Sequence, residues 1–154
     1  MFEIQIRKAR EEDVPVLQEL IEEMSHYERL PLAMTEGRLL KDGFGEPELF
    51  HALLAYVGDQ PAGYALTHSC YASFVGRGLF LEDLYIREPF RGHDVGKRLL
   101  GAVARLASEQ ECFEIVLNIL RWNLPALGFF RKAGAVELDD RAVFRIPGDR
   151  FHLL

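Results

Sequence analysis

Two adjacent carboxylates and a basic, glycine-containing loop have the clearest chemical potential in this sequence. Glu82 and Asp83 interrupt an otherwise apolar run from Leu79 to Ile86, which is typical of a strand covered on both faces. The segment Arg91–Gly96 follows, and apolar residues recur at helical spacing directly after it. A glycine-containing loop that enters a helix presents free backbone N–H groups and positive potential. The pattern therefore predicts an anion site close to two acids.

The spacing within this loop excludes two familiar phosphate-binding motifs. A P-loop has four residues between its glycines and a Ser or Thr after its Lys. Here Gly92 and Gly96 enclose three residues, and Arg98 follows Lys97. The dinucleotide fingerprint G-x-G-x-x-G is also absent from the loop. The anion must therefore be held by a different arrangement.

The surrounding pattern predicts a single α/β domain over residues 1–154 with a mixed sheet. The expected strands cover residues 2–8, 50–57, 62–74, 79–86, 113–119, 136–138 and 142–146, the last two as a closing hairpin. The expected helices cover residues 11–25, 35–42, 97–110 and 123–133, with Thr35 and Asn123 as N-caps. Residues 27–31 are expected to form a loop.

The alternation of a strand limits what the two acids can do together. Adjacent strand residues point to opposite faces, so Glu82 and Asp83 are not expected to share one site in a regular strand. An ion pair with Arg77, Arg87 or Arg91 is the structural alternative for each of them, because a buried carboxylate without a partner is costly.

Several ordered segments resemble one family of enzymes. They are Ser25–Glu28, Asp42–Glu46, Leu81–Asp83, Trp122–Ala126 and Phe129–Ala135, together with the loop Arg91–Gly96. The sequence resembles the GNAT superfamily of acyl-CoA-dependent N-acetyltransferases, and within it the diamine (spermidine/spermine and thialysine) acetyltransferases. The resemblance covers nearly the whole chain. It implies the GNAT fold, a mixed and mostly antiparallel sheet flanked by helices, and a homodimer with C-terminal strands at its interface.

The resemblance also implies roles for individual residues. Glu82 is expected to be the general base, directly or through a water, and the amine pocket is expected to include Tyr27, Glu28, Phe44, Glu82 and Asp83. Backbone groups of Leu84, Tyr85 and Ile86 would pair with the pantetheine arm of acetyl-CoA. The pyrophosphate would be held by Arg91, Gly92, His93, Asp94, Val95, Gly96 and Lys97, with Asn123 and Phe130 also near the cofactor. Tyr27 and Glu28 are equally consistent with a solvated loop, and Asn123 with a helix cap alone.

Two residues depart from the family pattern. Asp94 stands where the family usually has glycine, and it brings a negative charge close to the expected pyrophosphate. Phe130 stands at the position of the usual Tyr general acid, and a phenyl ring cannot protonate the departing thiolate. Both favour an alternative in which the chain is an acyl-CoA-binding module with weak turnover.

Composition narrows the class of protein further. The chain has 154 residues, a net charge of −6 and two cysteines, and neither these cysteines nor its five histidines show metal-ligand spacing. We therefore expect no metal, no nucleic acid and no membrane, and a cytoplasmic location. The favoured hypothesis is acetyl transfer from acetyl-CoA to a primary amine of a small diamine, polyamine or amino-acid-like substrate, by direct attack in a ternary complex. A protein or antibiotic amine is the alternative acceptor.

Overall fold

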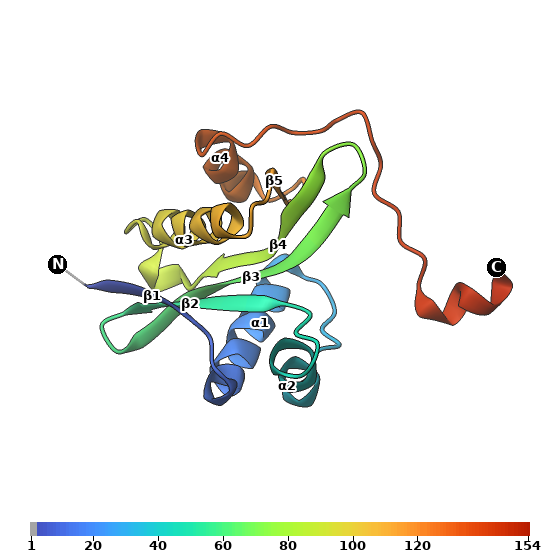
Figure 1. Cartoon of the computed structure of the whole chain (residues 1–154). Helices are drawn as coiled ribbons and strands as arrows, with labels where there is room; N and C mark the ends of the chain where they lie inside the picture. The colour runs from blue at the N-terminus through green and yellow to red at the C-terminus, as the bar shows by residue number, and fades with distance from the viewer. Residues whose placement is uncertain (1–2) are drawn as a thin grey trace. The chain divides into compact units, whose positions relative to one another are not determined.

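The computed structural model describes residues 3–154, which form two compact units. The first unit ends at Asn118 and the second spans Ile119–Leu154. The first contains a five-stranded sheet and the helices that cover it (Figure 1). The two units are described separately below.

The sheet follows the order of the chain. Its strands are β1 (Ile4–Lys8), β2 (His51–Val57), β3 (Gln60–Ala72), β4 (Gly76–Ile86) and β5 (Glu114–Val116). They lie in the order β1-β2-β3-β4-β5, and every neighbouring pair is antiparallel except β4 and β5. The parallel pair requires a crossover, which the helix α3 (Val95–Glu109) supplies. This confirms the expected mixed and mostly antiparallel sheet, although β5 is shorter than the expected strand.

Helices cover both faces of the sheet. In Figure 1, α1 (Val14–Glu28) and α2 (Glu36–Phe44) lie on one face and α3 on the other. Leu17 and Leu20 of α1 are fully buried against a cluster that includes Leu54 and Tyr64 of the sheet. On α3 the buried residues are Val95, Leu99, Val103 and Ala107, a spacing that matches the helical period. The apolar stripes of the sequence therefore become the two core layers.

The first helix differs from its prediction at both ends. Residues Glu11–Asp13 form a short 3-10 turn, and the α-helix continues to Glu28. It ends because Arg29 adopts the left-handed conformation, with φ of 58°. The N–H groups of Arg29 and Leu30 then donate to the carbonyls of His26 and Ser25. Tyr27 and Glu28 consequently belong to the last helical turn, and the predicted loop over residues 27–31 is wrong for them.

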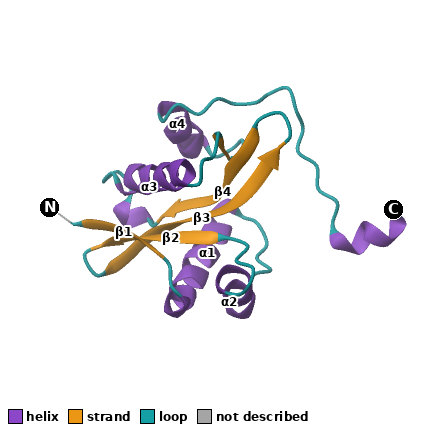
Figure 2. Ribbon diagram, viewed as in Figure 1, coloured by secondary structure: helices purple, strands orange, loops and turns teal. Residues whose placement is uncertain are grey.

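The second unit contains α4 (Leu124–Lys132) and a 3-10 helix, Gly148–Leu153. Asn123 caps α4 by accepting a hydrogen bond from the N–H of Ala126, as predicted. The predicted hairpin over residues 136–146 is wrong, because this segment contains no strand and is drawn as a loop in Figure 2. A strand forms only where a neighbouring strand can pair with its backbone N–H and C=O groups. The large apolar side chains of segment 136–146 are exposed: Val136, Leu138, Val143, Phe144 and Ile146.

Candidate active site

A β-bulge in β4 places both acids on the same face of the sheet. Leu66 of β3 pairs with Asp83, whereas the next residue of β3, Thr67, pairs with Leu81. Glu82 is therefore an extra residue in β4, and the alternation of side chains is reset at this point. The expectation that the two acids do not share a site applied to a regular strand, and the bulge removes that condition.

Contacts with β3 confirm this orientation. The hydroxyl of Tyr64 donates to Asp83 Oδ2 at 2.9 Å, and His68 Nε2 lies 3.3 Å from Glu82 Oε2. Tyr64 and His68 are four residues apart on one strand, so their side chains lie on the same face. Tyr64 also contacts the sulfur of Met24 in α1, which identifies this face as the one covered by α1. Sequence reasoning missed Tyr64 and His68, because their roles depend on the register of β3 against β4.

Glu28 brings a third carboxylate to the same place. Burial raises the pKa of Glu28, and the negative charge of Glu82 raises it further. Burial raises the pKa of Asp83 to about 6; the hydrogen bond from Tyr64 opposes this change, and the charges of Glu82 and Glu28 add to it. The negative charge of Glu82 therefore raises the pKa of both Glu28 and Asp83. A cationic amine placed among them would relieve both the repulsion and the cost of burying charge.

Arg87 has partners other than these acids. Its guanidinium binds Glu23 with N–O distances of 2.6–3.1 Å and Glu19 at 2.7 Å, both on α1. Tyr85 adds a longer contact to Glu23, at 3.4 Å. Arg87 therefore fastens the end of β4 to α1 and does not neutralise Glu82 or Asp83. The structural alternative of an ion pair with the two acids therefore does not hold for this arginine.

Arg91 contacts the end of β4 and two aromatic rings, and its predicted role toward the pyrophosphate stays a prediction. Its Nε donates to the carbonyl of Ile86 at 2.7 Å, and its guanidinium lies over the rings of Tyr27 and Tyr85, 5.0 and 5.7 Å from their centroids. These are cation–π distances. The first residue of the loop is thus held by the end of β4 and the last turn of α1. Arg77 donates to the carbonyl of Gln110, so this arginine does not support the ion-pair alternative either.

The loop itself has the geometry of an anion site. Gly92 and Asp94 have φ of 80° and 66°, and residues 91–94 are exposed. At the start of α3 the N–H of Arg98 donates to the carbonyl of Asp94 at 3.0 Å. The N–H groups of Val95, Gly96 and Lys97 precede it and lie at the positive end of the helix dipole. The Val95 side chain is buried and anchors the helix, while His93 and Lys97 are exposed.

An open strand edge leads from this loop along β4. The parallel pairing with β5 covers only Gly78, Leu79 and Phe80. The N–H of Arg87 donates to Ala62 beside β3, and backbone groups alternate in direction along a strand. The N–H groups of Leu84 and Ile86 therefore face the edge that β5 leaves uncovered, while Tyr85 faces β3. An extended ligand arm can pair with such an edge in the manner of an added strand.

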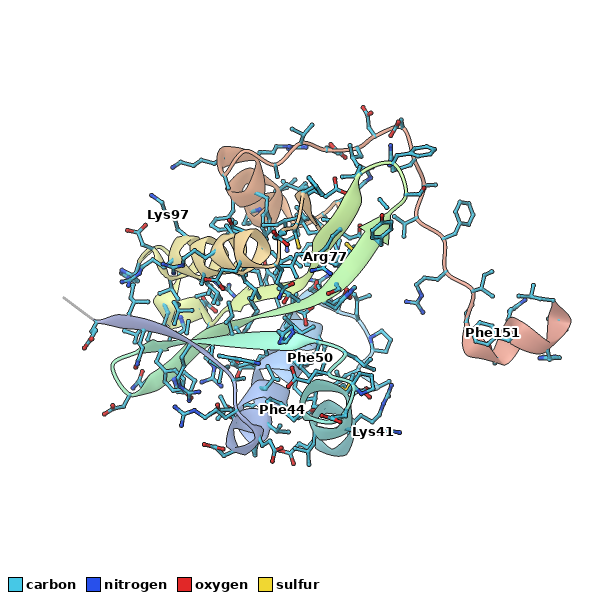
Figure 3. All side chains as sticks on the ribbon, in the orientation of Figure 1. Lys41, Phe44, Phe50, Arg77, Lys97 and Phe151 are labelled. Atoms are coloured by element: carbon cyan, nitrogen blue, oxygen red, sulfur yellow. The ribbon has the colours of Figure 1, made fainter. Side chains whose placement is uncertain are left out.

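Phe44 lies apart from this arrangement, and two other predicted residues belong to the second unit. Phe44 packs against the core and lines a hollow of about 710 Å³ with Gly45–Glu48. Figure 3 shows Phe44 and Lys97 on opposite sides of the sheet. Asn123 and Phe130 belong to the second unit, where Asn123 caps α4 and the buried Phe130 ring packs edge-on against Phe129, with centroids 5.0 Å apart. Their roles toward the cofactor stay predictions.

Among the described residues, no group of three or more His, Cys, Asp or Glu side chains is arranged to hold a metal ion. None of the described helices is both long and apolar enough to cross a membrane.

The edge of β4, the loop and α3 follow one another in the first unit, and comparison with known proteins identifies the fold to which they belong. Residues 14–135 match the acetyltransferase (GNAT) family. The chain is 31% identical to bovine (Bos taurus) thialysine N-epsilon-acetyltransferase over 95% of this chain and 94% of that protein. It is also 32% identical to a human (Homo sapiens) spermidine/spermine N(1)-acetyltransferase-like protein 1, over 87% of this chain and 21% of that protein.

A solved structure supports the same fold. An aminoglycoside N-acetyltransferase in complex with CoA superimposes with a TM-score of 0.77 and 18% identity, over 96% of this chain and 97% of that one. The chain belongs to the GNAT family. It is an acetyl-CoA-dependent N-acetyltransferase, as the sequence predicted.

Proposed function

We propose that the chain transfers the acetyl group of acetyl-CoA to a primary amine of a small diamine, polyamine or amino-acid-like substrate, by direct attack in a ternary complex. The observation that carries this proposal is the cluster of Glu28, Glu82 and Asp83, which the bulge in β4 creates. A substrate with two cationic groups can place one against Asp83 and Glu28 and the other, the reacting amine, beside Glu82. The names of the thialysine and spermidine/spermine relatives support the same substrate class.

Within this proposal, Glu82 removes the proton of the substrate ammonium. A primary ammonium has an ordinary pKa of about 10.4, so a base must convert it to a nucleophile near neutral pH. Glu82 is more exposed than Asp83 and is positioned to meet an incoming amine. Asp83 and Glu28 hold the positive charge of the substrate. The N–H of Leu84 is the donor that would polarise the acetyl carbonyl, since it faces the open edge of β4.

The residues of the loop fit the acyl donor. Acetyl-CoA supplies a thioester carbonyl that an amine can attack. The N–H groups that open α3 would hold its pyrophosphate, and Leu84 and Ile86 would pair with its pantetheine arm. The Arg91 guanidinium adds positive charge beside the loop, whereas the Asp94 carboxylate opposes it.

The experiment that tests this function is an acceptor panel. Thiol release from acetyl-CoA is measured with spermidine, thialysine, putrescine, lysine and a mixed peptide pool. We expect the highest kcat/KM with a small substrate that carries two cationic groups. A preference for the peptide pool would identify a protein amine as the acceptor, and a failure to use any amine would contradict the proposal.

Asp94 gives the first testable prediction. Replacing Asp94 with asparagine removes a negative charge beside the pyrophosphate, where the interaction of exposed charges is worth about 1 kcal/mol. We expect the Kd for CoA to fall roughly fivefold, measured by calorimetry. Asparagine tolerates the left-handed conformation as aspartate does, so Tm should stay unchanged.

Asp94→Gly separates charge from conformation. It also removes the charge, so its Kd for CoA should match that of Asp94→Asn. Glycine relieves the left-handed conformation, which stabilises the fold by about 1 kcal/mol, and it adds an entropy cost of about 1 kcal/mol. These two effects on the free energy of folding offset each other. A gain in affinity with glycine but none with asparagine would show that conformation, not charge, limits binding.

Phe130 gives the second prediction. We expect Phe130→Tyr to raise kcat for acetyl transfer, because it restores a hydroxyl at the position where the family protonates the thiolate. The gain should be modest, since a thiol with an ordinary pKa of about 8.5 is already a fair leaving group. Turnover under saturating acetyl-CoA checks this. Phe129→Tyr is the matched control on the neighbouring ring, and an unchanged kcat in a folded Phe130→Tyr would contradict the placement.

We propose in addition that the chain forms a homodimer through its C-terminal segment. The support is the set of exposed apolar side chains at Val136, Leu138, Val143, Phe144 and Ile146, which need a covering surface. We also propose a cytoplasmic location, because the two cysteines, Cys70 and Cys112, are free thiols and thiols stay reduced in that compartment.

A further inference from the structure

A half-exposed histidine lies directly behind the proposed base. His68 stands on β3, and its ring stacks on Phe80 of β4 with centroids 5.0 Å apart and an angle of 12° between the ring planes. Its Nδ1 lies 3.2 Å from the carbonyl oxygen of Ser69, and its Nε2 lies 3.3 Å from Glu82 Oε2. The stack and the two nitrogen contacts fix the ring in one orientation.

These contacts determine how the ring can carry protons. A carbonyl oxygen only accepts hydrogen bonds, so Nδ1 must carry a hydrogen to bond Ser69. Nε2 is then the nitrogen that faces the Glu82 carboxylate. In a neutral ring Nε2 has a lone pair, and the contact with Glu82 becomes a hydrogen bond only when one proton lies between the two atoms. The geometry thus describes a pair that shares a single added proton.

We propose that His68 is the proton outlet of Glu82: it takes the proton that Glu82 receives from the substrate amine and releases it to solvent. This inference rests on the proposed function, and it adds a residue of β3 to the machinery of the reaction. His68 does not touch the amine in this scheme. It acts through Glu82 and is a positioning and relay residue.

The proton balance of the outlet is simple. The ammonium group gives one proton to the Glu82 carboxylate, which becomes a carboxylic acid, and the amine is left neutral. The acid then gives that proton to Nε2, which restores the carboxylate and leaves an imidazolium. The imidazolium then loses the Nε2 proton to water and keeps the proton on Nδ1, so that the pair returns to its starting state. No bond between heavy atoms changes in these steps.

The surroundings of Glu82 leave His68 as the suitable outlet. The other groups that face it are Asp83, which accepts a hydrogen bond from Tyr64, and Glu28 at the end of α1. Both are carboxylates that the scheme uses to hold the positive charge of the substrate. The Glu82 side chain is itself 53% exposed, so His68, whose side chain is 36% exposed, would act as the outlet when a bound amine covers the carboxylate.

The test compares two histidines in similar ion pairs. His51 lies 3.6 Å from Glu48, and the side-chain exposures of this pair, 34% and 43%, are close to the 36% and 53% of His68 and Glu82. We expect His68→Phe, which keeps a ring on Phe80, to lower kcat/KM for the amine roughly tenfold. This is less than the roughly 10²–10⁴-fold effect of a general base itself. His51→Phe should leave kcat/KM unchanged, and both variants should keep the wild-type Kd for CoA.

Chemical rescue separates a relay from a structural role. Imidazole added to His68→Ala should raise kcat/KM in proportion to its concentration, while it leaves wild type and His51→Phe unchanged. A His68→Phe variant with wild-type kcat/KM would overturn the outlet, and so would a loss of activity that imidazole does not restore. If Glu82→Gln is inactive while the His68 variants keep wild-type kcat/KM, only the outlet fails. If wild type acetylates no amine of the panel, the proposed function fails and the outlet fails with it.

Discussion

Replacing Glu82 with glutamine is expected to lower kcat/KM for the amine by roughly 10²–10⁴-fold, the usual contribution of a general base. Glutamine has the shape of glutamate but cannot accept the proton of an ammonium group. The position on the bulge, 3.3 Å from His68, leaves the new amide with a hydrogen-bond partner, so the fold should persist. The measurement is thiol release with the best amine of the panel at saturating acetyl-CoA.

The pH dependence of this loss identifies its cause. A primary amine has an ordinary pKa of about 10.4, so the fraction of free amine rises about tenfold for each pH unit below that value. The deficit of Glu82→Gln should therefore shrink as the pH rises toward 10, because the substrate then loses its proton without help. A deficit that is constant with pH would show that Glu82 binds the substrate and does not act as the base.

A matched control excludes a general effect of charge. Glu12 lies in the 3-10 turn before α1 and pairs with Arg10 at 3.5 Å on an exposed surface. Glu12→Gln removes the same charge and should keep wild-type activity, and the Kd for CoA should be unchanged in both variants. A fall of less than about threefold in Glu82→Gln would contradict the assignment of the base, since it lies far below the range for general base catalysis.

The central difference between sequence and structure is the bulge at Glu82. The apolar run and its two acids predicted the strand β4, and the strand is present. The extra residue, however, follows from how β3 and β4 align, with Leu66 opposite Asp83 and Thr67 opposite Leu81. Side-chain periodicity along one strand contains no information about that register. The acidic cluster and its partners Tyr64 and His68 could therefore be found only in three dimensions.

The loop before α3 was more predictable because its conformation is local. Glycine and a residue that tolerates the left-handed region were expected near the helix start, and Gly92 and Asp94 both have positive φ. The family pattern has glycine at the position of Asp94 for the same reason. The C-terminal segment was less predictable. Its short apolar stretches predict strands, but a strand forms only where a neighbouring strand pairs with its hydrogen-bonding groups.

Asp83 gives the second large prediction, which concerns stability. Its pKa of about 6 lies above the ordinary 3.8, mainly because burial disfavours the charged form. Below pH about 4 the carboxyl is protonated in the folded and the unfolded chain, so no penalty exists. Between about 4 and 6 only the unfolded chain loses the proton, and stability falls as the pH rises. Above about 6 the penalty is complete and corresponds to about 3 kcal/mol.

Asp83→Asn should remove this penalty. Its amide oxygen can still accept from Tyr64, and its NH2 group faces the carboxylates of Glu28 and Glu82. We expect the free energy of unfolding at pH 7.5 to rise by up to about 3 kcal/mol and the gain to vanish near pH 4, measured by chemical denaturation at both pH values. The same substitution removes a charge that binds the substrate, so KM for a diamine should rise roughly tenfold, which is about 1.4 kcal/mol.

Tyr64→Phe is the matched control with the opposite sign. It removes the hydroxyl that donates to Asp83 at 2.9 Å and leaves a buried carboxylate without that donor. Hydrogen bonds to charged groups contribute about 1.5–3 kcal/mol, so stability at pH 7.5 should fall by that amount and recover in part near pH 4, where the carboxyl is neutral. Loss of stability in Asp83→Asn at pH 7.5 would show that the hydrogen bond outweighs the cost of burial. A gain in the free energy of unfolding for Asp83→Asn, together with a loss for Tyr64→Phe, would show that the charge of Asp83 serves amine binding at the expense of stability.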